Sequence, residues 1–222
     1  MKMTTEFKRT SGICLLIGVI LAAATMVLHP TGGDINHIVK IRSVLVFSHS
    51  VALICLPFIG FGTWGLSNIL QTKNGLSTLA FIIFSFGLIA AMVAAAINGL
   101  TLPYFASKYA ATGNDLSLIN AVIGYGHAVN ISMTYIFIAA TSFAIGIWSI
   151  LIIKTNQIPK WLGYFGLIIL AFGSLGVILN FNFTNLFGFR LFVFGLVSWK
   201  IVVGINMLLK SESEKQTEPV ST

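Results

Sequence analysis

The sequence has few charged residues for its length. Only 9% of its 222 residues are charged, whereas 56% are hydrophobic. A soluble domain normally carries about 25% charged residues. A chain of this composition has too little polar surface to cover a globule in water, which excludes a soluble protein. We therefore expect a lipid bilayer to be its natural solvent.

Acids, cysteines and short metal-binding motifs are also scarce. The only acids between residues 7 and 211 are Asp34 and Asp115, and this scarcity argues against a proton-coupled carrier, which normally uses intramembrane carboxylates. Cys14 and Cys55 fall at different depths of the apolar runs, so we expect no disulfide between them. No H-x-x-x-H, H-E-x-x-H or C-x-x-C pattern is present, so no local spacing forces a metal site.

Long apolar runs dominate what remains of the sequence. Inside a bilayer the backbone must satisfy its own hydrogen bonds, so each span is a helix or part of a closed barrel. A barrel would show short alternating strands, whereas these runs approach or exceed the roughly 20 residues of a helical span. We predict an all-α integral membrane bundle of six helices, at residues 12–28, 43–70, 76–100, 119–153, 161–179 and 187–209.

The basic residues fall mainly in the connections between these runs, where they indicate topology rather than binding of nucleic acid. With the N-terminus inside, the inner segments hold eight lysines and arginines: Lys2, Lys8, Arg9, Lys73, Lys154, Lys160, Lys210 and Lys215. The outer loops hold four: Lys40, Arg42, Lys108 and Arg190. The positive-inside rule then places both termini in the cytoplasm. We expect a bacterial inner (plasma) membrane, a transmembrane domain over 1–210 and a disordered cytoplasmic tail over 211–222.

The four histidines gather at one predicted face of the membrane. His29 ends the first span, His37 lies in the loop that follows, and His49 and His127 lie in the outer parts of the second and fourth spans. At 1.5 Å per helical residue, the three span histidines reach the outer boundary of the hydrocarbon. The sequence therefore predicts a histidine-rich pocket at the outer face.

Such a pocket suits a metal ion or a haem. Imidazole is the commonest metal-ligating side chain, and zinc or copper accepts a mixed set of nitrogen and oxygen ligands. The candidate metal ligands are Asp34, His37, His49, His127 and His29. Alternatively, His49 and His127 could ligate a b-type haem from two helices, with Arg42 meeting its propionates. That arrangement resembles bis-histidine membrane cytochromes in architecture, without a shared motif.

A transport pathway is the competing interpretation. Asn130 and Thr134 share a stripe of the fourth span with His127, and Asn98 lies near the outer end of the third span. Lys200 falls near the middle of the sixth span, where a charge costs at least about 2.5–3.5 kcal/mol. We expect Lys200 to extend its amine toward the inner surface. The alternatives are a neutral amine, contacts with carbonyl oxygens or with Asn68 or Asn180, and a place on a path for a solute or anion.

Two further alternatives remain open. An enzyme of this kind would be a metal-dependent membrane hydrolase or a haem-linked redox protein, but no glutamate lies nearby to act as a base. A structural or partner-binding membrane subunit, alone or as an oligomer, would need no chemistry of its own. The favoured hypothesis is a multi-pass membrane protein with an outer pocket for a metal ion, haem or small molecule.

Overall fold

The computed structural model describes residues 4–110 and 116–217, and within these two ranges it contains helices and turns but no strand. The helices are α1 (Thr5–Leu28), α2 (Ile35–Lys40), α3 (Arg42–Ile69), α4 (Leu76–Ala96), the π-helical turn η1 (Ile97–Thr101), α5 (Leu102–Tyr109), α6 (Leu116–Thr155), α7 (Lys160–Ile178) and α8 (Leu186–Thr217). The predicted all-helical fold is confirmed.

Six helical segments of the described chain are long and apolar enough to cross a membrane. They match the six predicted runs, with small differences at the ends. The third is longer than predicted, reaching Tyr109 rather than residue 100, because η1 and α5 continue α4 through Pro103. At the C-terminus, α8 continues to Thr217, into the segment predicted to be a disordered tail, and residues 218–222 lie outside the described ranges.

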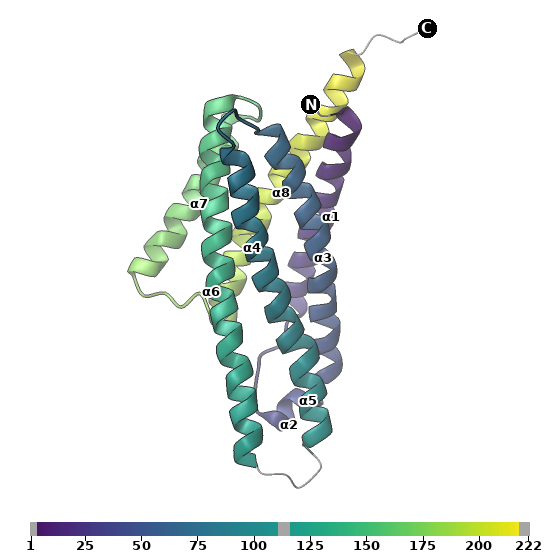
Figure 1. Cartoon of the computed structure of the whole chain (residues 1–222), viewed down its shortest axis with the longest axis vertical. Coiled ribbons are helices and arrows are strands. Elements are labelled where there is room, and N and C mark those ends of the chain that lie inside the picture. Colours follow the sequence, from purple (N-terminus) through teal and green to yellow (C-terminus); the bar gives the residue numbers. More distant parts are fainter. Residues whose placement is uncertain (1–3, 111–115, 218–222) are drawn as a thin grey trace.

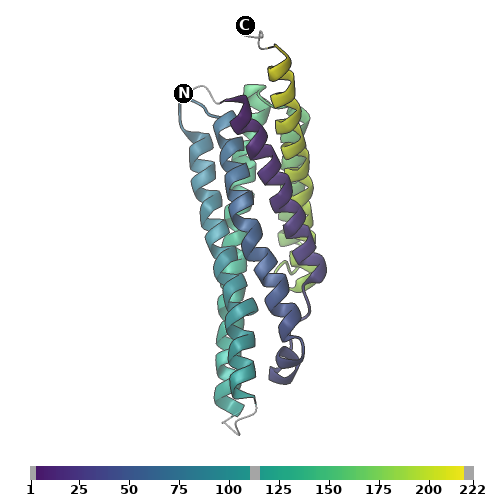
Figure 2. The same ribbon diagram turned by 90° about the vertical axis from the view of Figure 1, so that its right-hand side faces the viewer.

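The long helices run side by side in an elongated bundle, from which α7 tilts away (Figure 1). The start of α1 and the end of α8 lie at one end of the bundle, here called the terminal end. Helices α2 and α5 lie at the opposite end, here called the distal end, as both views show (Figure 1, Figure 2). The two described ends of the chain therefore lie at the same end of the bundle.

Glycines let α1 and α3 pack closely. A Cβ atom on Gly62 would lie 2.5 Å from Cβ of Leu15, and one on Gly18 would lie 2.7 Å from Cγ1 of Ile59. Both distances are too short for real Cβ atoms, so a larger residue would force the helices apart. Small residues at such crossings allow the van der Waals packing that drives helix association in lipid.

Two hydrophobic clusters divide the bundle. The larger one fills the terminal half and includes the fully buried Phe84, Trp148 and Trp199. The smaller one lies at the distal end, where Ile35 and Ile38 of α2 pack with residues of α3, α5 and α6. Asp34 begins α2 by accepting a hydrogen bond from the backbone N–H of His37 at 2.9 Å, which is the usual role of an aspartate at an N-cap.

Candidate functional site

A chamber of about 780 Å³ lies inside the bundle, bounded by α1, α3, α4, α6, α8 and the segment that follows α1. Ligand sites in proteins typically enclose about 300–1,000 Å³ and combine apolar walls with a few polar groups. Here the walls are mostly apolar. The polar side chains that line the chamber are Thr25, His29, His49, Asn98, Asn120, His127, Asn130, Thr134, Thr184, Asn185 and Lys200.

The chamber brings together most of the residues singled out from the sequence. Three of the four histidines line it, and so do all four residues of the predicted transport pathway, namely Asn98, Asn130, Thr134 and Lys200. Asp34, His37 and Arg42 are not among the lining residues. Asp34 caps α2, and Nε2 of His37 lies 3.3 Å from the carbonyl oxygen of Thr31. Arg42 is exposed at the start of α3.

The metal centre predicted from the sequence is not assembled as a group of ligands. Within the described ranges, no three histidine, cysteine, aspartate or glutamate residues are placed to hold a metal ion together. The reason is local: Asp34 and His37 belong to the short helix α2, whose cap and backbone contacts keep their polar atoms outside the chamber. Asp115 lies outside the described residues.

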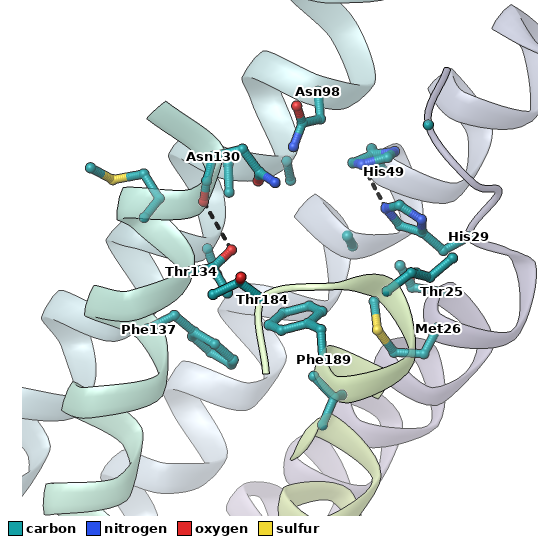
Figure 3. A pocket seen from close by; sticks show the side chains of 18 of the residues that line it. Thr25, Met26, His29, His49, Asn98, Asn130, Thr134, Phe137, Thr184 and Phe189 are labelled. Atoms are coloured by element: carbon teal, nitrogen blue, oxygen red, sulfur yellow. Dashed lines mark hydrogen bonds between the residues drawn. The ribbon is translucent and has the colours of Figure 1, made fainter. Parts of the chain in front are cut away.

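Two of the histidines that line the chamber contact each other through their rings. Nε2 of His29 lies 3.2 Å from Nε2 of His49, and the ring centroids are 4.7 Å apart. His29 directly follows the last residue of α1, whereas His49 lies about two turns from the start of α3 (Figure 3). The sequence predicted that both would lie at the same depth but did not predict that they would touch.

The remaining ring nitrogens of the two histidines face carbonyl oxygens. Nδ1 of His29 lies 2.8 Å from the carbonyl oxygen of Pro30, and Nδ1 of His49 lies 2.8 Å from that of Leu45. A carbonyl oxygen only accepts hydrogen bonds, so these two contacts favour the tautomer of each neutral ring that carries its hydrogen on Nδ1, although the Ser48 hydroxyl also lies 3.3 Å from Nδ1 of His49. Each neutral ring then presents a lone pair on Nε2. Two lone pairs at this distance repel unless a proton or another cation lies between or beside them.

Arg190 fixes the position of His29. Its Nε donates to the carbonyl oxygen of Met26 at 2.9 Å, and its Nη2 donates to that of His29 at 2.7 Å. These carbonyls end α1, where helical acceptors have no partner within the helix. From the sequence alone Arg190 is expected only in an outer loop, because its contacts depend on α8 packing beside α1. Burial lowers the pKa of His29, the nearby Arg190 lowers it further, and the contact with Pro30 opposes both.

The π-helical turn η1 brings α4 against His49. Its Gly99 lies so close that an added Cβ would overlap Cβ of His49, so only glycine fits here. The neighbouring Asn98 points into the chamber, opposite Asn130 of α6 (Figure 3). Neither amide side chain has a hydrogen-bond partner within the described ranges, whereas the Thr134 hydroxyl donates to the Asn130 carbonyl oxygen at 2.9 Å. The two amides are therefore available to a molecule in the chamber.

Lys200 lines the chamber from α8 and is only 4% exposed. Its Nζ lies over the ring of Phe84, 4.4 Å from the centroid. The favoured expectation, that Lys200 extends its amine to the inner surface, is wrong, because the side chain is buried and its Nζ lies over Phe84. The alternative, a lysine that lines a path for a solute or anion, stays a prediction.

Comparison with known proteins found no matching family model, no similar curated protein and no similar solved structure.

Proposed function

We propose that this protein is a multi-pass integral membrane protein that binds a small organic molecule inside its helical bundle. The observation that carries the proposal is the chamber, whose volume of about 780 Å³ and mostly apolar walls match those of ligand sites. Histidine, asparagine and threonine side chains supply the few polar groups that orient a ligand. The two free amides of Asn98 and Asn130 are the clearest of these.

The outer surface of the bundle supports the membrane part of the proposal. Large apolar side chains stand exposed on it, among them Phe86 at 61%, Phe143 at 69% and Phe172 at 71%. A soluble monomer rarely exposes extended apolar patches, whereas lipid would cover these side chains. We place the protein in a bacterial inner membrane with both ends in the cytoplasm, because the charge distribution favours that orientation.

Movement of the bound molecule across the membrane would extend this function to transport. All four residues of the predicted pathway line one chamber, which supports the extension. The terminal half of the bundle is filled by buried side chains such as Leu66, Leu70 and Trp148. Transport would therefore require these packed helices to separate, so binding is the more direct inference.

Filling the chamber tests the proposal. Ala91 lines the chamber, whereas its neighbour Met92 is 46% exposed on the outside of α4. We expect wild-type protein in lipid nanodiscs to bind methyl decanoate or naphthalene in calorimetric titrations corrected with empty nanodiscs. Ala91→Phe should weaken this binding at least about tenfold because the new ring occupies the chamber, and Met92→Phe should leave it unchanged. Equal binding by both variants, or none by the wild type, would contradict the proposal.

A transition-metal ion is a second candidate ligand, and the His29–His49 pair favours it. A tetrahedral ion with bonds of about 2.0–2.1 Å to nitrogen holds two such nitrogens about 3.3 Å apart, close to the observed 3.2 Å. We propose zinc or copper at this pair, with further positions filled from the chamber. Haem b between His49 and His127 is supported less, because Nε2 of His49 already faces His29.

A further inference from the structure

Lys200 is a buried cation that faces the chamber without an anionic partner. It is 4% exposed and lines the chamber, its Nζ lies over the ring of Phe84, and the thiol of Cys55 is near enough to interact with it. None of the described acidic residues lines the chamber. The face of an aromatic ring attracts an ammonium group, but it neither accepts all of its hydrogens nor cancels its charge. The ammonium group of Lys200 can therefore still bind an anion.

The surroundings of Lys200 limit where that anion can come from. The neighbouring parts of the wall are apolar, with Ile59, Leu88 and Val197 among the lining residues. Buried charges in proteins are normally paired or hydrogen-bonded because desolvation is costly. Since the described chain supplies no carboxylate here, an anionic molecule in the chamber would provide the missing partner.

The distance between the polar parts of the chamber limits the shape of that molecule. Arg190 touches the carbonyl of His29, and Lys200 lies ten residues further along α8, about 15 Å at 1.5 Å per residue. Apolar side chains such as Val193 and Leu196 line the chamber between these two levels. A ligand whose charged group meets Lys200 would lay an apolar body along this wall toward the histidines and asparagines.

We propose that the chamber binds a carboxylic acid with an extended apolar body, whose carboxylate pairs with the ammonium of Lys200. A lysine presents a compact point charge with three donors, which suits a single carboxylate. The histidines and the amides of Asn98 and Asn130 lie toward the other end of the ligand, where they would hydrogen-bond to a polar group if the ligand carries one. This inference rests on the proposed function, since it assigns a chemical class to the molecule in the same chamber.

The experiment compares an acid with its own ester. Wild-type protein in lipid nanodiscs is titrated with decanoate and with methyl decanoate, and empty nanodiscs correct for partitioning into lipid. We expect decanoate to bind at least about tenfold more tightly than the ester. Lys200→Met, which keeps the apolar volume, should weaken decanoate binding at least about thirtyfold and leave ester binding within about twofold.

Two further variants keep the test informative. Lys200→Arg retains the positive charge and should retain preference for the acid. Lys210→Met makes the same substitution on the same helix outside the chamber, where Nζ of Lys210 donates to the Gln157 carbonyl at 2.8 Å, and should change neither affinity. If Lys200→Met folds poorly, Lys200→Gln takes its place in the same titration. This variant should also lose the preference for the acid over the ester.

The outcomes separate this inference from the proposed function. If the wild type binds acid and ester equally, or if Lys200→Met weakens both equally, the carboxylate assignment is overturned while binding in the chamber stands. If neither decanoate nor methyl decanoate nor naphthalene binds the wild type, the proposed function fails and this inference fails with it.

Discussion

At the scale of single residues, what the chamber can bind near His29 and His49 depends on which ring nitrogens of these two histidines carry a hydrogen. If both Nδ1 atoms donate to the carbonyl oxygens that they contact, both Nε2 atoms are left as acceptors that face each other at 3.2 Å. A protonated ring would resolve the repulsion, but burial and Arg190 lower the pKa of His29. A metal ion that accepts both lone pairs resolves it without protonating either ring.

Metal analysis tests this interpretation of the pair. Protein purified without chelator should contain about one zinc or copper ion per chain, as expected for one shared site. His29→Gln and His49→Gln should each lose most of it because one nitrogen ligand is removed. His37→Gln is the matched control, since its ring contacts the Thr31 carbonyl outside the chamber.

If both variants still contain the metal ion, or if the wild-type protein contains no metal ion, the histidine pair is excluded as a metal site. An absorption spectrum of the same sample tests the haem alternative, because a haem held by His49 and His127 would give a strong Soret band.

At the scale of helices, close packing of α1 on α3 holds one side of the chamber in place. Gly62 and Gly18 face Leu15 and Ile59 across this crossing, and His29 and His49 lie beyond its distal end on the same two helices. A shift of either helix would change the separation of the two rings. The crossing therefore sets the geometry of the site as well as the stability of the fold.

Gly62→Ala should destabilise the protein by about 1–3 kcal/mol, because an added methyl group overpacks the contact with Leu15. Gly60→Ala on the same helix is the control, since its Cβ would lie 3.4 Å from Cδ1 of Leu88, an ordinary van der Waals distance. Thermal unfolding in nanodiscs measures both variants. Equal midpoints for the two variants would show that this crossing tolerates a methyl group.

At the scale of the whole molecule, six segments able to span a membrane place the described ends of the chain at one end of the bundle. The distal end carries α2 and α5, and the histidine pair lies at the end of α1 and near the start of α3. If the bundle crosses the bilayer with its terminal end in the cytoplasm, the polar part of the chamber faces outward. A ligand would then enter from the side opposite the cytoplasm.

Cysteine accessibility checks this orientation. After replacement of Cys14 and Cys55 by alanine, single cysteines at Asn74, in the turn before α4, and at Thr31, before α2, probe the two ends of the bundle. In intact cells a membrane-impermeant maleimide should label the cysteine at position 31 and spare that at position 74, because the positive-inside rule keeps the terminal end in the cytoplasm. The reverse labelling pattern would show that the terminal end faces away from the cytoplasm and would contradict the predicted orientation.

Long apolar runs were enough to predict the helices, because a single segment in lipid can satisfy the hydrogen bonds of its own backbone only by forming a helix. Counting depth along these runs also predicted that His49, His127 and Asn130 would lie near one face, and all three line the chamber. The boundaries were less predictable, since the continuation through η1 and α5 depends on packing around Pro103 and Gly99.

The sequence by itself therefore determined the helical class, the number of apolar segments and the depth of each polar group, because all three follow from hydropathy and a fixed rise per residue. Only the tertiary structure decided which groups touch. It joined His29 to His49, directed Arg190 to the end of α1, and kept Asp34 and His37 on α2 outside the chamber. These contacts depend on how the helices pack against one another, which small residues at the α1–α3 crossing help to set, and on the local contacts that hold α2.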